Sequence, residues 1–276
     1  MFECKLSSAQ LFKNLIDIIS TMLSDGELIV TNNGLKLRSL EPTRAALIDL
    51  FLSKDVCETY TCDEETRLKI NFNDLSKLVG RASGDEAVFL RFLADENKLQ
   101  VKFKGKSTRT YSIPLLDQVI CETMEEGSIP TDVQIELSTS VLSQAIKDAK
   151  LIDDLVDFIV QKNGEFVIYA ESERGDLRID FEEKATKYDS ENDVVATYSI
   201  EFLIKILKAG VISETVTIEF SKNSPIVFKF PIDNDAEKGR IIYFLAPQGE
   251  TEEEEEEEED IYDESDEELI DDVEEY

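Results

Sequence analysis

The chain has 276 residues, of which 42% are hydrophobic and 33% are charged. This length can bury one or two cores, and the composition is that of a soluble globular protein with a polar surface. No apolar stretch reaches the length that spans a membrane and no secretion leader follows Met1, so we expect an intracellular protein without a membrane partner.

The residue types exclude several kinds of catalysis. The chain has no histidine, which removes Ser-His, Cys-His and His-metal chemistry and leaves carboxylate, lysine or tyrosine mechanisms. It also lacks a glycine-rich phosphate-binding motif. We therefore expect no enzyme and no cofactor. The alternative is a carboxylate-metal enzyme that uses the acidic groups Asp63-Glu64-Glu65 or Asp153-Asp154 with Asp157, which we expect to be solvated surface.

Four cysteines are spread over the first half of the chain and form no C-x-x-C pair. A zinc site would have to recruit all four from distant segments, because no histidine is available. We therefore expect reduced thiols and no metal site. The cysteines are Cys4, Cys57, Cys62 and Cys121.

The net charge of -32 is unevenly distributed. Residues 250–276 contain 19 acidic residues and no basic residue, so residues 1–249 hold 42 acidic and 29 basic residues, a net charge of -13. The run Glu252–Glu259 repels itself, and we expect a disordered, solvated acidic tail over 250–276. Its scattered apolar residues leave two interpretations open, an interaction segment and a solubilising tail.

Apolar residues spaced by three and four predict amphipathic helices at 8–22, 72–82, 139–151 and 199–209, with Val141 on an apolar side. Their opposite faces carry seven basic and four acidic residues, a net positive set in a negative chain. A solvated face is the alternative for any single base; for the whole set, we favour a surface that contacts an anionic partner. The bases are Lys13, Lys77, Arg81, Lys147, Lys150, Lys205 and Lys208.

Short alternating runs between the helices predict strands, and so an α+β fold of antiparallel sheets with helices on one face. In chain order the runs are 28–31, 35–40, 45–52, 59–62, 67–70, 87–92, 99–103, 108–114, 165–170, 176–181, 194–198, 215–220, 226–231 and 240–245.

The two halves repeat one pattern at an offset of about 130 residues. Leu6 corresponds to Leu137, and the turn pair at 33–34 corresponds to the pair at 163–164. The segment 111–114 is matched with 244–247. A duplication is therefore expected, and its pseudo-symmetry suggests a closed assembly. The expected divisions are a domain at 1–114, a connector at 115–132, a domain at 133–249 and the tail at 250–276.

Several stretches together resemble the ring-shaped sliding clamps of the proliferating cell nuclear antigen (PCNA) type. They are Asn33 to Leu40, Tyr60 to Asp63, Leu75 to Lys77, Ser224 to Ile226 and Tyr243 to Pro247. The resemblance implies two similar domains per chain, three chains per ring, helices that line a central channel and sheets outside.

The resemblance also implies a function: a polymerase processivity factor that encircles double-stranded DNA without reading its sequence and lies with the DNA in the cell. Polymerases, a clamp loader, ligases and nucleases are the implied protein partners. By the resemblance, Lys13, Lys77, Arg81, Lys147 and Lys208 face the DNA. Helix geometry adds Lys150 and Lys205.

The family's partner pocket lies beneath the interdomain connector and takes a short helical turn. Here Glu126-Gly127-Ser128 stands where an apolar residue is usual, with Met124 as its substitute, and Gly249 replaces a bulky apolar residue, so partner affinities are expected to differ from the family norm. The matched positions are Leu40, Arg44, Ala45, Leu47, Met124, Ile129, Pro130, Pro225, Phe244, Ala246 and Pro247.

Subunits of such rings join by pairing edge strands, here 108–114 of one chain with 175–181 of the next. The apolar members of the interface are then Tyr111, Ile113, Leu177 and Ile179. Two other interpretations stay open, a specialised subunit of a heterotrimeric ring and an acidic histone-chaperone-like or DNA-mimicking protein whose tail is the active part. Deletion of residues 250–276 separates the clamp from the tail-driven protein.

Overall fold

The structure is a computed structural model that describes residues 1–6, 8–119, 129, 131–188 and 192–249. Its first half contains two α-helices, two short 3-10 helices and nine strands among these residues. In chain order they are β1 (Phe2–Leu6), α1 (Ala9–Ser20), β2 (Asp25–Thr31), β3 (Gly34–Leu40), β4 (Ala46–Ser53), the 3-10 helix η1 (Lys54–Val56), β5 (Thr59–Cys62), β6 (Thr66–Asn71), α2 (Phe72–Val79), β7 (Ala87–Leu93), η2 (Ala94–Glu96), β8 (Lys98–Lys104) and β9 (Thr108–Pro114).

The second half follows the same order. Its elements are β10 (Val133–Ser138), α3 (Thr139–Ala149), β11 (Leu155–Val160), β12 (Glu165–Ser172), β13 (Gly175–Lys184), β14 (Lys187–Tyr188), β15 (Val194–Ser199), α4 (Ile200–Ile206), η3 (Leu207–Val211), β16 (Thr215–Phe220), β17 (Ile226–Ile232) and β18 (Asp235–Leu245).

The predicted duplication is present in the strand pairing as well as in the element order. The order β5-β1-β7-β8-β9 of the first half matches β14-β10-β16-β17-β18 in the second, and β6-β2-β3-β4 matches β15-β11-β12-β13. Leu6 pairs with Val88 as Leu137 pairs with Val216. All these pairs are antiparallel, and the fold is α+β as expected.

Two predicted correspondences shift by a residue. Val30 lies opposite Leu35 and its equivalent Val160 lies opposite Phe166, so Gly34 corresponds to Glu165 rather than to Gly164. Tyr111 lies opposite Val101, and Tyr243 lies opposite Phe228 at the equivalent place in the other half. The equivalent of Tyr111 is therefore Tyr243, which shares its inward orientation, rather than Phe244, which faces the other side of its strand.

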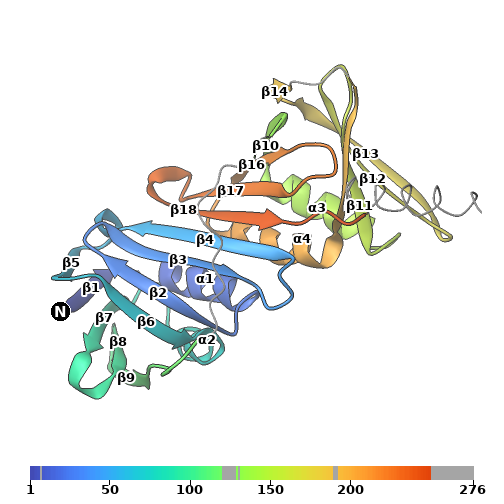
Figure 1. Ribbon diagram of the computed structural model, residues 1–276. Coiled ribbons are helices and arrows are strands. Elements are labelled where there is room, and N and C mark those ends of the chain that lie inside the picture. Colours follow the sequence, from blue (N-terminus) through green and yellow to red (C-terminus); the bar gives the residue numbers. More distant parts are fainter. Residues whose placement is uncertain (7, 120–128, 130, 189–191, 250–276) are drawn as a thin grey trace, which may run out of the picture.

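The halves are joined by a direct strand pair between β4 and β18. The register runs from Gly239 opposite Leu52 to Leu245 opposite Ala46, which makes a nine-stranded sheet shared by both halves. Figure 1 shows the two strands side by side in the middle of the molecule. Because the strands are far apart in the sequence, this pairing fixes the geometry of the two halves relative to each other.

The four α-helices lie on one side of the sheets (Figure 1). Helix α1 packs on α2, α3 packs on α4, and α1 contacts η3 across the seam between the halves. The Ser8 hydroxyl caps α1 by accepting from the Gln10 amide, and the Asn71 side chain caps α2 in the same way. The helices therefore form one layer whose outer face comes from both halves.

The helices end earlier than predicted. Helix α2 ends at Val79, so Arg81 lies beyond it; Lys150 is the C-cap of α3; and Lys208 belongs to the 3-10 helix η3. The placement of Val141 on the apolar side was wrong. This residue is 49% exposed, because the buried stripe of α3 runs through Leu142 and its neighbours one turn apart.

Four strands were not anticipated, β1, β10, β11 and β14. β1 and β10 alternate buried residues with more accessible ones, but each lies just before a helix. β11 follows the acidic pair Asp153-Asp154. β14 has only two residues, too few for a periodic signal. In the described part of the chain, none of the helices combines the length and apolar character needed to cross a bilayer.

Candidate DNA-facing surface and partner site

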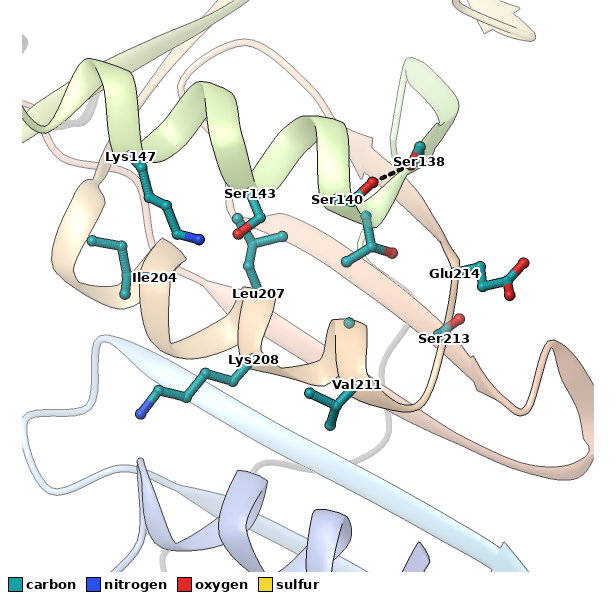
Figure 2. Close-up of a pocket in the computed structure, with 12 residues that line it drawn as sticks. Ser138, Ser140, Ser143, Lys147, Ile204, Leu207, Lys208, Val211, Ser213 and Glu214 are labelled. Atoms are coloured by element: carbon teal, nitrogen blue, oxygen red, sulfur yellow. Dashed lines mark hydrogen bonds between the residues drawn. The ribbon is translucent and has the colours of Figure 1, made fainter. Parts of the chain in front are cut away.

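The seven candidate bases lie on the helical layer and at its ends. Lys147 on α3 and Lys208 on η3 stand on opposite walls of a groove of about 730 Å³ (Figure 2). Ser140 and Ser143 add hydroxyl groups to the α3 wall. The lining also includes the hydroxyl residues Ser138, Thr139 and Ser213 and one carboxylate residue, Glu214. The two cations and the hydroxyl groups around the groove are suited to contact the oxygens of a phosphate backbone.

Three of the seven bases are engaged by carboxylates. The Lys77 ammonium lies 2.9 Å from Asp74, and that of Lys205 lies 2.7 Å from Glu201. Lys150 pairs with Asp154. The lysines lower the pKa of both Glu201 and Asp154, mainly through hydrogen bonds to the carboxylates.

The remaining four bases have no carboxylate partner within the described residues. The Lys13 ammonium donates only to the Gly80 carbonyl, at 3.3 Å. The Arg81, Lys147 and Lys208 side chains are exposed. These four can therefore meet an anion without first breaking an ion pair.

A second candidate site lies on the opposite, outer face of the nine-stranded sheet. Leu40 pairs across the ladder with Leu47, and Leu47 pairs with Phe244, so the three form a row over β3, β4 and β18. Leu47 is 3% exposed and yet does not belong to the hydrophobic core cluster. The guanidinium of Arg38 lies over the Phe244 ring at 5.6 Å.

The row continues at the end of the shared sheet. The Ala246 amide donates to the Ala45 carbonyl at 2.8 Å, which extends the β4–β18 pair by one bond. Pro225 and Pro247 are both half-buried. Five of the predicted pocket residues are thus joined by backbone pairing although they lie more than 200 positions apart: Leu40, Ala45, Leu47, Phe244 and Ala246. Pro225 directly precedes β17 of the same sheet.

A cleft of about 500 Å³ lies beside this row at the turn from β3 to β4. Arg44 lines it together with Gln118 and Val119 from the start of the connector. Ile129 is half-buried, and Met124 and Pro130 lie outside the described residues. The connector residues that can be placed therefore contribute to the cleft through 118 and 119, neither of which was among the predicted pocket residues.

The buried carboxylate of Glu41 organises this turn. It accepts hydrogen bonds from the Ala45 amide at 2.7 Å and from the amide and hydroxyl of Thr43. Burial acts to raise the pKa of Glu41, but these hydrogen bonds outweigh it and hold the pKa below its usual value. The turn places Arg44 in the left-handed region, with φ of 65°. Glu41 was missed in the sequence; its only signal was a carboxylate two residues before a threonine in a turn.

The predicted interface residues lie on two free edges. Among the residues that the structure describes, β9 pairs only with β8, and β13 pairs only with β12. Tyr111 and Ile113 on β9, like Leu177 and Ile179 on β13, are half-buried against the core. β9 corresponds to β18 and β13 corresponds to β4 in the duplication. β18 and β4 pair with each other inside the chain, whereas β9 and β13 belong to different sheets.

The fold is that of a clamp-type subunit. Its duplicated halves are joined by one shared sheet, its helical face carries bases without a carboxylate partner among the described residues, and β9 and β13 are edge strands. The sequence models of the PCNA N-terminal and C-terminal domains match residues 1–120 and 127–248. The chain belongs to the proliferating cell nuclear antigen family, whose members are processivity factors and not enzymes.

Curated relatives and solved structures agree with this assignment. The chain is similar to the DNA polymerase sliding clamp of Thermococcus fumicolans, with 30% identity over 252 residues, 90% of this chain and 99% of the relative. It is also 30% identical to DNA polymerase sliding clamp 1 of Pyrobaculum aerophilum over 246 residues, 88% of this chain and 96% of that protein. PCNA from Thermococcus kodakaraensis has the same fold, with a TM-score of 0.81 at 22% identity over 90% of this chain and all of that one.

Proposed function

We propose that this protein is a DNA sliding clamp in which three copies form a closed ring around double-stranded DNA. The observation that carries the proposal is the pair of free edges β9 and β13, the duplicates of the strands that already join the two halves. If β9 of one copy pairs with β13 of the next as β18 pairs with β4 inside the chain, the copies assemble head to tail. Such contacts close into a ring when the rotation between neighbouring copies divides a full turn evenly. The three-chain count comes from the family resemblance.

The duplication also supplies the register of the proposed junction. Within the chain, Tyr243 lies opposite Ile48. The ladders make Tyr111 the equivalent of Tyr243 and Leu177 the equivalent of Ile48. Tyr111 of one copy should therefore face Leu177 of the next, with Ile113 at the level of 175 and Arg109 at the level of 179.

In such a ring the helical layer faces the DNA. The bases contact phosphates rather than base edges, so binding is salt-sensitive and independent of sequence, as sliding requires. The net charge of -13 over residues 1–249 repels DNA from the rest of the surface. The mixture of free and paired bases keeps the hold on DNA weak.

The outer row around Leu40, Leu47 and Phe244 is the proposed docking site for partner proteins. An apolar strip beside a cleft with one exposed arginine suits a short helical turn with apolar anchors. Polymerases, the clamp loader, ligases and nucleases are the partners that the family resemblance implies. The pocket and the DNA channel lie on opposite faces of the sheet, so both can be occupied at once.

Topological retention on DNA tests the proposal. The protein is loaded on a nicked circular plasmid by a clamp loader with ATP and passed through gel filtration at about 0.5 M NaCl, where simple ionic contacts are weak. A ring stays with the circle, leaves after the plasmid is cut once, and stays again if both ends are blocked by bound protein. Retention that does not respond to cutting would contradict encirclement. A protein with residues 250–276 deleted should behave in the same way, whereas a tail-driven chaperone should lose its activity.

A further inference from the structure

Two cysteines that are 53 positions apart meet inside the first half of the molecule. Cys4 lies on β1 and is 2% exposed, and Cys57 directly follows η1 and is half-buried. Their sulfur atoms are 2.7 Å apart, well inside the ordinary contact distance of about 3.5 to 4.0 Å between heavy atoms. The clamp function uses neither of them.

The backbone holds both residues in this arrangement. The Cys57 amide donates to the Lys54 carbonyl at 2.9 Å, and the adjacent Glu58 amide donates to the Lys5 carbonyl at 2.8 Å. Cys4 is fixed in the middle of its sheet, opposite Tyr60 on β5 and Leu90 on β7. The sulfur atoms therefore need to approach by well under 1 Å to reach the length of a covalent bond, about 2.05 Å.

We propose that Cys4 and Cys57 form a dithiol that a peroxide oxidises reversibly to an intramolecular disulfide. The Cys57 thiolate attacks one peroxide oxygen, the O–O bond breaks, and a sulfenic acid forms with release of hydroxide. The Cys4 sulfur then attacks the Cys57 sulfur and displaces the hydroxyl group, while the Cys4 proton leaves with it as water. In total two thiols and one hydrogen peroxide give one disulfide and two waters, and two thiols of a reductant reverse the reaction by exchange.

The environment of the two sulfurs supports these roles. The hydrogen bond between the two sulfurs, in which either can donate, lowers the pKa of Cys57, and the same bond, together with burial, raises the pKa of Cys4. Cys57 is also the more accessible partner, because it is half-buried whereas Cys4 is only 2% exposed. Cys62 is different, because its thiol donates to the Glu64 carbonyl at 3.1 Å and has no sulfur neighbour among the described residues.

The bond would add a covalent link between β1 and the segment after η1, which already share an ion pair between Lys5 and Glu58 and apolar packing around Cys4. η1 contacts β18 of the second half, and β1 belongs to the sheet that ends in the free edge β9. Oxidation would therefore link η1, which contacts the second half, covalently to the sheet that contains β9, the strand proposed to pair with the next chain. A crosslink that closes a loop of this length is expected to raise the melting temperature by several degrees.

The test uses the native full-length protein and hydrogen peroxide, followed by alkylation and peptide mapping without reductant. Two of the four thiols should disappear, the intact mass should fall by about 2 Da, and one crosslinked peptide should contain Cys4 and Cys57. Dithiothreitol should restore all four thiols. Cys62→Ser should behave like the wild type, while Cys57→Ser should lose the crosslink with an unchanged circular dichroism spectrum.

Three outcomes would overturn the proposal. The first is that all four thiols persist in the native protein after peroxide treatment. The second is a disulfide that includes Cys62 or Cys121, and the third is an oxidised Cys57 that never forms a disulfide with Cys4. Since all three outcomes are read from the wild-type protein, they do not depend on whether a variant folds.

Discussion

The four unpaired bases of the helical layer should account for the salt dependence of DNA binding, and Lys208 is the sharpest place to test this. Lys208→Gln removes one exposed cation per chain and three per ring. Each phosphate contact contributes about 0.9 to the slope of log K against log salt concentration, so the slope should fall by about 0.9 if one copy contacts DNA at a time and by about 2.7 if all three do.

Lys205→Gln is the matched control, three residues away. The Lys205 ammonium is already held by Glu201 at 2.7 Å and lies over the Phe202 ring at 4.9 Å. Its removal should weaken binding through the unpaired Glu201 charge while the salt slope stays that of the wild type. A lower salt slope in Lys208→Gln therefore reports the loss of phosphate contacts. A weaker affinity at an unchanged slope in Lys205→Gln reports the newly unpaired carboxylate of Glu201.

The assay is fluorescence anisotropy of a labelled duplex, titrated with each protein at a series of NaCl concentrations. The native mass of each variant is measured in parallel, so that a changed slope is not confused with a broken ring. The reasoning is refuted if Lys208→Gln keeps the wild-type slope, or if Lys205→Gln lowers the slope by as much as Lys208→Gln.

Three further predictions concern the fold and the partner site. Gly34→Ala places a Cβ 2.0 Å from a carbonyl oxygen and should cost about 3 kcal/mol in chemical denaturation. Gly164→Ala, in the corresponding turn of the second half and with nothing within 4 Å, should cost about 1 kcal/mol, and equal costs would contradict this. Glu41→Gln should lose about 2 kcal/mol at neutral pH. Because the folded pKa of Glu41 is lowered, that stability is present above its ordinary value of 4.5 and is lost as the pH falls through the folded value, so a wild-type advantage that is constant with pH would argue against it. Phe244→Ala should weaken a partner peptide at least tenfold in a calorimetric titration and leave the ring mass unchanged, and wild-type peptide affinity would exclude the pocket assignment.

Local patterns in the sequence predicted local structure well. Three strands, 59–62, 108–114 and 215–220, have the predicted ends, because each alternates cleanly and is bounded by turn residues or by a helix. The helix layer was also predicted, but α4 was expected to run to 209 and instead tightens into a 3-10 helix at Leu207. Hydrophobic periodicity does not distinguish these two helix types over a few residues.

The candidate sites also contain local features, which the sequence predicts, and contacts between distant segments, which it does not. The basic helix faces follow from spacing, and the ion pairs Lys150–Asp154 and Lys205–Glu201 are four residues apart, so their pairing could have been inferred from the sequence. The Glu41 turn is also local, because its carboxylate accepts hydrogen bonds from Thr43 and Ala45, two and four residues away. The β4–β18 pair and the contact between Cys4 and Cys57 depend on segments brought together by the tertiary fold. One sequence without an alignment holds no signal for such contacts.

The mass of the native protein in solution tests the closed ring most directly. Light scattering after gel filtration at low micromolar concentration should give about 94 kDa, three times the chain mass of 31.3 kDa. Tyr111→Asp, which places a charge in the proposed junction opposite Leu177, should shift the protein toward one chain. A wild-type mass of one chain at these concentrations would contradict a ring built from copies of this protein alone.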